Sequence, residues 1–312
     1  MSSYFDNKPV FMEPKVEQYS SHMIMSNVSQ EIKTKIVNID TKFRDDYEFQ
    51  KCSVIDYSVT MPESINNVCS MTVENVELPI SYYNISSALG NNYFKVTRTN
   101  TQESKIITIP DGEYNLTELK DKINEVIDTH TGFEGLTFDI LNHKIRFYVD
   151  NNTEEYILYF AVNNDGSFDK FNMKSKIGWL LGFTKISYDT SDPNLSQGYT
   201  VGDKLPDLHR PKILYLYIDD FSQTKQNSFV TMMSRSRNSH NIIGKIMVDR
   251  ATNGFQTLFL ANKANGYLLS DVRKYNGKSD ISKLQIQLFD EFDRKIDLNG
   301  LDLSLSLKFD YM

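Results

Sequence analysis

The chain has 312 residues, of which 40% are hydrophobic, 12% aromatic and 24% charged. This composition excludes a disordered or collagen-like chain, and the length allows a sizeable core. A formal net charge of −7 excludes the overall basic footprint of a general nucleic-acid binder. Two cysteines are too few for a disulfide framework, and no apolar run reaches the roughly 18 residues of a membrane span. We therefore expect a soluble protein made in a reducing compartment.

The first segment, residues 1–33, differs from the rest of the chain. It contains two prolines and scattered apolar residues without a sustained period. Such a segment cannot form a core, so we predict an extended N-terminal arm. Its apolar residues, among them Val10, Phe11 and Met23, indicate that it lies on a surface, either of its own body or of a partner.

Residues 34–312 are predicted to form the body. Short β-rich runs occur at residues 35–40, 53–61, 68–78, 93–97 and 105–109. The Pro-Asp-Gly turn at 110–112 precedes the clearest helix, which begins at Leu116. Its apolar residues recur at steps of three and four, Asn115 can cap it, and Glu118 stands at the capping-box position.

The middle of the chain continues with mixed elements. We expect a hairpin that turns at Asn142-His143, a strand over 155–162, another hairpin turn at 163–166 and a short helix over 175–183. We predict 105–186 to be an α+β insertion. The stretch 187–211 is expected to be irregular. It exceeds the usual loop length of about 12 to 15 residues, as a contact surface or a disordered tip does.

The last third consists of predicted strands. The closing strand has strict period two: Leu301, Leu303, Leu305, Leu307 and Phe309 oppose polar residues. These five apolar residues should face the interior, and the strand should pair on both sides or be covered on one. Ten or more short strands with few helices predict a mainly β fold, an antiparallel jelly-roll sandwich.

A search for chemistry finds no convincing site. Gly277-Lys278-Ser279 has the end of a P-loop, but Val272 stands where the first glycine is needed. Five histidines are far apart, and none has a metal-ligand partner at the required spacing. We therefore predict no catalytic, cofactor-binding or metal-ligating residue, no cofactor, and a protein that is not an enzyme.

Three weaker signals have simpler interpretations. Asp219-Asp220 could pair as acid and base, but without a nearby histidine we interpret them as charges at a strand end. Residues 163–169 resemble a calcium loop faintly, and a β-turn explains them. The basic, Ser-rich run 234–240 could contact phosphate, and a solvated loop is the simpler explanation.

Several segments together resemble one family. The segment 37–45, with sequence VNIDTKFRD, resembles the opening of minor capsid proteins from nucleocytoplasmic large DNA viruses, although Thr41-Lys42 replaces the usual Ser-Arg. Further similar segments follow in consistent order to the end of the chain: Val76-Glu77-Leu78-Pro79, Tyr82-Tyr83-Asn84-Ile85, Ile109-Pro110-Asp111-Gly112-Glu113-Tyr114, Gly178-Trp179-Leu180-Leu181-Gly182-Phe183, Ile218-Asp219-Asp220-Phe221, Leu288-Phe289-Asp290 and Leu298-Asn299-Gly300-Leu301-Asp302.

The resemblance implies a jelly-roll body and a structural role in an icosahedral virion assembled in host cytoplasm. It leaves open a penton at the five-fold vertex or a minor component beneath the major capsid lattice. The expected partners are other capsid subunits, itself or the major capsid protein, with a homopentamer if it is a penton and no sequence-specific nucleic acid. The alternative is a glycan-binding or host-attachment jelly roll, whose aromatic platform would be Tyr82-Tyr83 or the tyrosines at 188 and 199.

Overall fold

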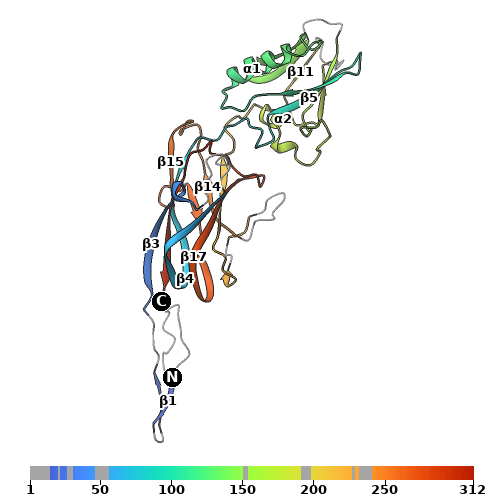
Figure 1. Cartoon of the computed structure of the whole chain (residues 1–312). Coiled ribbons are helices and arrows are strands. Elements are labelled where there is room, and N and C mark those ends of the chain that lie inside the picture. Colours follow the sequence, from blue (N-terminus) through green and yellow to red (C-terminus); the bar gives the residue numbers. More distant parts are fainter. Residues whose placement is uncertain are drawn as a thin grey trace.

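The structure is a computed structural model that describes residues 15–19, 22–26, 31–45, 56–149, 154–190, 198–226, 229–231 and 241–312. The described chain forms two lobes joined end to end (Figure 1). Each lobe has its own cluster of buried hydrophobic residues. The first lobe is built from both ends of the chain, and the second from its middle.

The first lobe is an antiparallel β structure. Its elements are β3 (Lys33–Asp40), the 3-10 turn η1 (Thr41–Phe43), β4 (Asp56–Pro79), β12 (Ile213–Asp219), β13 (Lys225–Gln226), β14 (Ile242–Met247), β15 (Leu258–Asn262), β16 (Leu268–Ser270), β17 (Arg273–Asp290) and β18 (Ser304–Tyr311). Among the described residues they join in the order β16-β14-β12-β17-β4-β18-β3, with β15 paired to β4 and β13 to β17.

Strand β4 explains how one continuous sheet makes a sandwich. It is 24 residues long and changes direction near Asn67, whose φ is 56°. Residues 56–71 pair with β17, residues 68–77 pair with β18, and residues 75–79 pair with β15. β4 therefore lies in the middle of one antiparallel sheet, with β17, β12, β14 and β16 on one side and β18 and β3 on the other. This mainly β, antiparallel sheet encloses the first hydrophobic cluster, so the predicted jelly-roll fold class is confirmed.

The closing strand β18 confirms most of the predicted period. Leu303, Leu305, Leu307 and Phe309 are at most 1% exposed, and β18 pairs with β3 on one side and β4 on the other. The expectation for Leu301 is wrong, since its side chain is 47% exposed. Leu301 follows the turn at Gly300 and precedes the first paired residue, so the strand's alternation does not orient it.

A polar clamp on the outer face holds the start of β4. Asp56 accepts hydrogen bonds from Gln285 and Gln287, both 2.8 Å, and from Lys295 at 2.5 Å. Burial raises the pKa of Asp56, but the Lys295 ammonium and the two amides outweigh this and hold the pKa below its usual 3.8. The folded state therefore favours the ionised carboxylate.

The second lobe is the α+β part. Its elements are β5 (Tyr93–Arg98), β6 (Ser104–Thr108), α1 (Leu116–Asp128), β7 (Leu136–Leu141), β8 (Lys144–Val149), β9 (Tyr156–Tyr159), the 3-10 turn η2 (Met173–Ser175), α2 (Ile177–Leu180), β10 (Ser187–Asp189) and β11 (Tyr199–Val201). Two small sheets, β10-β9-β5-β6 and β11-β8-β7, lie with α1 (Figure 1). The stretch 187–211 was expected to be irregular, but β10 and β11 both lie in it.

Helix α1 forms where the sequence predicts it. Asn115 accepts a hydrogen bond from the Glu118 amide, and the Glu118 carboxylate accepts one from the Asn115 amide, which completes the capping box. Leu119, Ile123 and Ile127 are fully buried against the second cluster. The helix is therefore anchored by one apolar stripe, while its other face is open to solvent.

Two expectations on domain organisation remain predictions. The boundaries 105–186 for an insertion are narrower than the second hydrophobic cluster, which draws on residues from Ile85 to Leu208. Of the predicted arm 1–33, the described backbone forms a hairpin of β1 (Lys15–Tyr19) and β2 (His22–Ser26), and residues 1–14, 20–21 and 27–30 lie outside the described chain.

Candidate functional site

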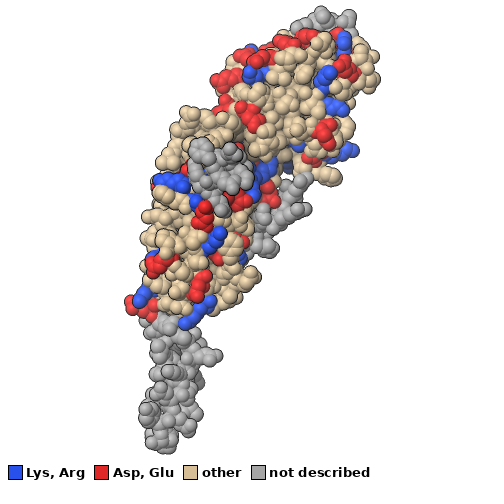
Figure 2. Space-filling model, in the orientation of Figure 1, with Lys and Arg blue, Asp and Glu red and all other residues tan. Residues whose placement is uncertain are grey.

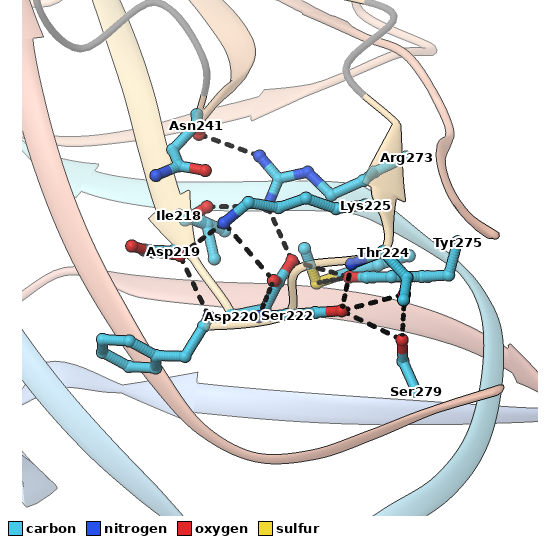
Figure 3. A network of polar contacts seen from close by, with 12 residues as sticks. Ile218, Asp219, Asp220, Ser222, Thr224, Lys225, Asn241, Arg273, Tyr275 and Ser279 are labelled. Carbon is cyan, nitrogen blue, oxygen red and sulfur yellow. Dashed lines mark hydrogen bonds and ion pairs between the residues drawn. The ribbon is translucent and has the colours of Figure 1, made fainter. Parts of the chain in front are cut away.

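The paired aspartates at the end of β12 belong to a network of polar contacts with Lys225, Arg273 and Tyr275 (Figure 3). The Asp220 carboxylate is fully buried and accepts hydrogen bonds from the Arg273 guanidinium at 2.9 Å and from the Tyr275 hydroxyl at 2.7 Å. Arg273 also donates to the Ile218 carbonyl at 2.7 Å. Lys225 pairs with Asp219 at 2.6 Å and also with Asp220 at 3.6 Å.

This cluster is a cross-brace between strands rather than an acid–base pair. The Arg273 side chain is 2% exposed, so both charges of the Asp220–Arg273 pair are desolvated and depend on each other. Burial, followed by the negative charge of Asp220, raises the pKa of Tyr275, which therefore stays a neutral donor. The sequence interpretation as strand-end charges is right in position, but it missed Arg273, 53 residues further along.

The other sequence candidates give no site in the described chain. Asp165 accepts hydrogen bonds from the amide and hydroxyl of Ser167, and Gly166 donates to the Asn163 carbonyl, as in a β-turn. The basic run 234–240 lies outside the described residues. Within the described ranges, no group of three or more His, Cys, Asp or Glu is placed to hold a metal ion.

The first and last of the segments that resemble capsid proteins contact each other in the fold. Thr41 and Arg44, from the first segment, both donate to the Asp302 carboxylate, at 3.1 Å and 2.7 Å, although Asp302 belongs to the last segment. The Thr41 amide donates to the Leu303 carbonyl at 3.0 Å, and the Leu303 amide donates back to the Thr41 hydroxyl. These bonds fix the corner where β3 leaves the sheet and β18 enters it.

A second joint connects the two lobes. The amide of Asn84 donates to Glu113 at 3.1 Å, and the Asn84 side-chain amide donates to the Tyr114 carbonyl at 2.8 Å. Arg250, from the jelly roll, donates to the same Glu113 carboxylate at 2.6 Å and lies over the Tyr82 ring. Burial raises the pKa of Glu113, and the charge of Arg250 offsets only part of that rise.

A groove with a volume of about 690 Å³ opens beside this joint. Its walls come from the loop after β4, the segment that leads into α1, the segment before β12, and the loop before β15. The lining residues are Tyr83, Asn84, Gly112, Glu113, Tyr114, Asn115, Leu116, Glu118, Pro206, Leu208, His209 and Phe255. The rings of Tyr83 and Phe255 stack there with centroids 5.8 Å apart and planes inclined by 29°.

Of the four tyrosines that the sequence offered as an aromatic platform, Tyr83 lines the groove and the others do not. Tyr83 is half-buried and faces the groove, but Tyr82 is only 2% exposed under Arg250. Tyr188 is buried in the second core and donates to Asp203. Tyr199 is half-buried in β11, near Arg146. Sequence reasoning had no signal for Phe255, the stacking partner of Tyr83, because 171 intervening residues separate the two.

The surface shows no single-sign field on the face in view. Acidic and basic side chains are interspersed over both lobes (Figure 2). A protein that binds nucleic acid through phosphates gathers Lys and Arg on one face, and this face does not. In the part of the chain that the structure describes, no helix is long and apolar enough to cross a membrane.

Comparisons with known proteins give structural likenesses only. No protein-family model matches the sequence, and no curated protein matches it. The crystal structure of the mavirus penton protein aligns with a TM-score of 0.46 and 12% identity, over 91% of this chain and 100% of that chain. The cryo-EM structure of the Sputnik virophage aligns with a TM-score of 0.41 and 12% identity, over 89% and 98%. The assignment of the jelly roll rests on the strand order above, not on these scores.

Proposed function

We propose that this protein is a structural subunit of an icosahedral viral capsid, of the minor capsid or penton type found in nucleocytoplasmic large DNA viruses. It acts by protein–protein assembly and not by catalysis. Its partners are copies of itself or a major capsid protein, and it resides in the virion after assembly in the host cytoplasm.

The observation that carries the proposal is the jelly-roll strand order. The sequence resemblance implies this fold, and the antiparallel order β16-β14-β12-β17-β4-β18-β3, with β15 paired to β4, supports it independently. Jelly rolls are common in capsids, although fold alone does not fix function. The resemblance adds specificity, because its first and last segments are bonded at Asp302.

Open edges of the jelly roll offer surfaces for assembly. Within the described residues, β3 pairs only with β18, and β15 pairs only with β4. On β3, Ile36 is 63% exposed, and on β15, Leu258 and Leu260 are 68% and 46% exposed on the same face. Edge strands with exposed apolar side chains are a liability in a monomer, and a neighbouring subunit would cover them.

Native mass spectrometry of the purified protein tests the finer assignment. A penton is expected to give a species with five times the mass of the 36.1 kDa chain. A minor component beneath the lattice is expected to form a species smaller than a pentamer when it is alone, and to bind the major capsid protein. A chain that stays monomeric and binds neither itself nor capsid subunits would contradict the proposal.

A further inference from the structure

We propose that the groove beside Tyr83 and Phe255 is a binding site for a neutral carbohydrate. This goes beyond the capsid role, since a capsid subunit needs no such site in order to assemble. The inference rests on three properties of the groove: its aromatic wall, its unused polar groups and its charge.

The wall is a stacked aromatic pair held at the surface. Tyr83 and Phe255 are both half-buried, with one ring against the other and both lining the groove. Their backbones are fixed from below, because Ile80 exchanges hydrogen bonds with Gln256 and Thr257 in the loop that carries Phe255. Pyranose rings present a flat array of C–H groups, and a fixed aromatic face supplies the apolar contact that such a surface needs.

Polar groups with spare hydrogen-bonding capacity surround this wall. Glu113 uses its Oε2 for Arg250 and Asn84, and Glu118 uses its Oε2 for the capping box, so no bond in the described chain involves either Oε1. Asn115 uses its Oδ1 in the cap, which leaves its amide donors for a ligand. Sugar hydroxyls are both donors and acceptors, and they match a mixture of carboxylate and amide groups.

The charge of the groove selects the ligand. Glu113 and Glu118 face it, and the only ionisable base among its described lining residues is His209. The Arg250 guanidinium is 2% exposed and already paired with Glu113. A sialylated or sulfated glycan would place an anion against carboxylates without a free Lys or Arg to compensate. A neutral glycan avoids that penalty.

The size of the groove fits this class. Ligand pockets usually have volumes of about 300–1,000 Å³ and combine apolar walls with a few fixed polar groups. At about 690 Å³ the groove leaves room for more than one pyranose ring.

A glycan array with neutral, sialylated and sulfated glycans, probed with the full-length protein, tests the inference. We expect binding to neutral glycans only, and we expect Phe255→Ala and Tyr83→Ala each to weaken the affinity for the best neutral glycan roughly tenfold in calorimetric titration. Phe255→Leu, which keeps the apolar bulk but not the flat ring, should also weaken it. The matched control is Phe171→Ala, at a ring that is 96% exposed outside the groove, and it should leave binding unchanged.

The outcomes are distinct from those of the capsid proposal. No binding to any neutral glycan, preferred binding to sialylated or sulfated ones, or full affinity in both alanine variants with unchanged melting temperature would overturn the inference. Particle assembly should be unaffected by these substitutions, because the capsid proposal places its contacts on other surfaces.

Discussion

Leu305 in β18 offers a direct test of the packing inside the jelly-roll lobe. Its side chain is fully buried, and its partners across the sheet, Ile39 and Val76, are buried as well. Leu→Ala at such sites costs about 2–5 kcal/mol, because transfer energy is lost and a cavity remains. At about 3 kcal/mol, the melting temperature should fall by roughly 6–12 °C in a domain of this size.

The neighbouring residues of the same strand supply the controls. Ser304 lies on the outer face with no bond to its hydroxyl in the described chain, so Ser304→Ala should change stability by less than about 0.5 kcal/mol. For a charged pair, Leu305→Asp should prevent folding, while Ser306→Asp should fold. Ser306 is the better site for the added charge, because Ser304 lies between Asp40 and Glu77.

Scanning calorimetry of Leu305→Ala and Ser304→Ala tests which face of β18 is buried. Equal melting temperatures for the two variants would refute the register of β18. An equal yield of soluble Leu305→Asp and Ser306→Asp would do the same, since a one-residue slip exchanges the two faces of a strand.

Four further predictions follow from other parts of the molecule. Arg273→Met should lower the unfolding free energy by about 3 kcal/mol in urea denaturation, because the buried Asp220 loses its buried cationic partner and keeps, in the described chain, only Lys225, at 3.6 Å, as a counter-charge. A loss below about 1 kcal/mol would speak against the cross-brace. The pKa of Asp56 is lowered in the folded state, so its stabilisation is present above its usual 3.8 and is lost as the pH falls below that value. In Asp56→Asn, the melting temperature should therefore depend less on pH below about 3.8 than it does in the wild type. An unchanged pH dependence in this range would count against the polar clamp. Replacing both exposed leucines of β15 with lysine should block assembly without changing the monomer's melting temperature, and normal particles would exclude that face as a contact. Deletion of residues 1–30 should leave a folded, soluble body that fails to assemble. An unfolded product would show that the arm is part of the core of the body.

The sequence predicted what local pattern determines. Period two in β18 and the capping box of α1 both depend on residues that are close together in the sequence, and both are confirmed. Leu301 shows the limit of that reasoning, since the alternation in the sequence begins before the first paired residue of the strand. The sequence likewise suggested two strands over 53–61 and 68–78, whereas β4 runs unbroken through its bend at Asn67.

Contacts between distant segments could not be predicted. Nothing in the local sequence pairs Asp220 with Arg273, and nothing brings Phe255 to Tyr83. Both pairs form because the jelly roll brings together strands and loops that are far apart in the sequence. The same reason explains why the inter-lobe groove was missed, although the sequence had named Tyr83 as one half of an aromatic platform.

The most direct test of the capsid role is a cryo-EM reconstruction of the particle that carries this protein. We expect ordered density for the two-lobed chain in the icosahedral shell, at the five-fold vertices for a penton or beneath the major capsid lattice for a minor component, with β15 against a neighbouring subunit. A complete shell whose density is accounted for without this chain would contradict the proposed function.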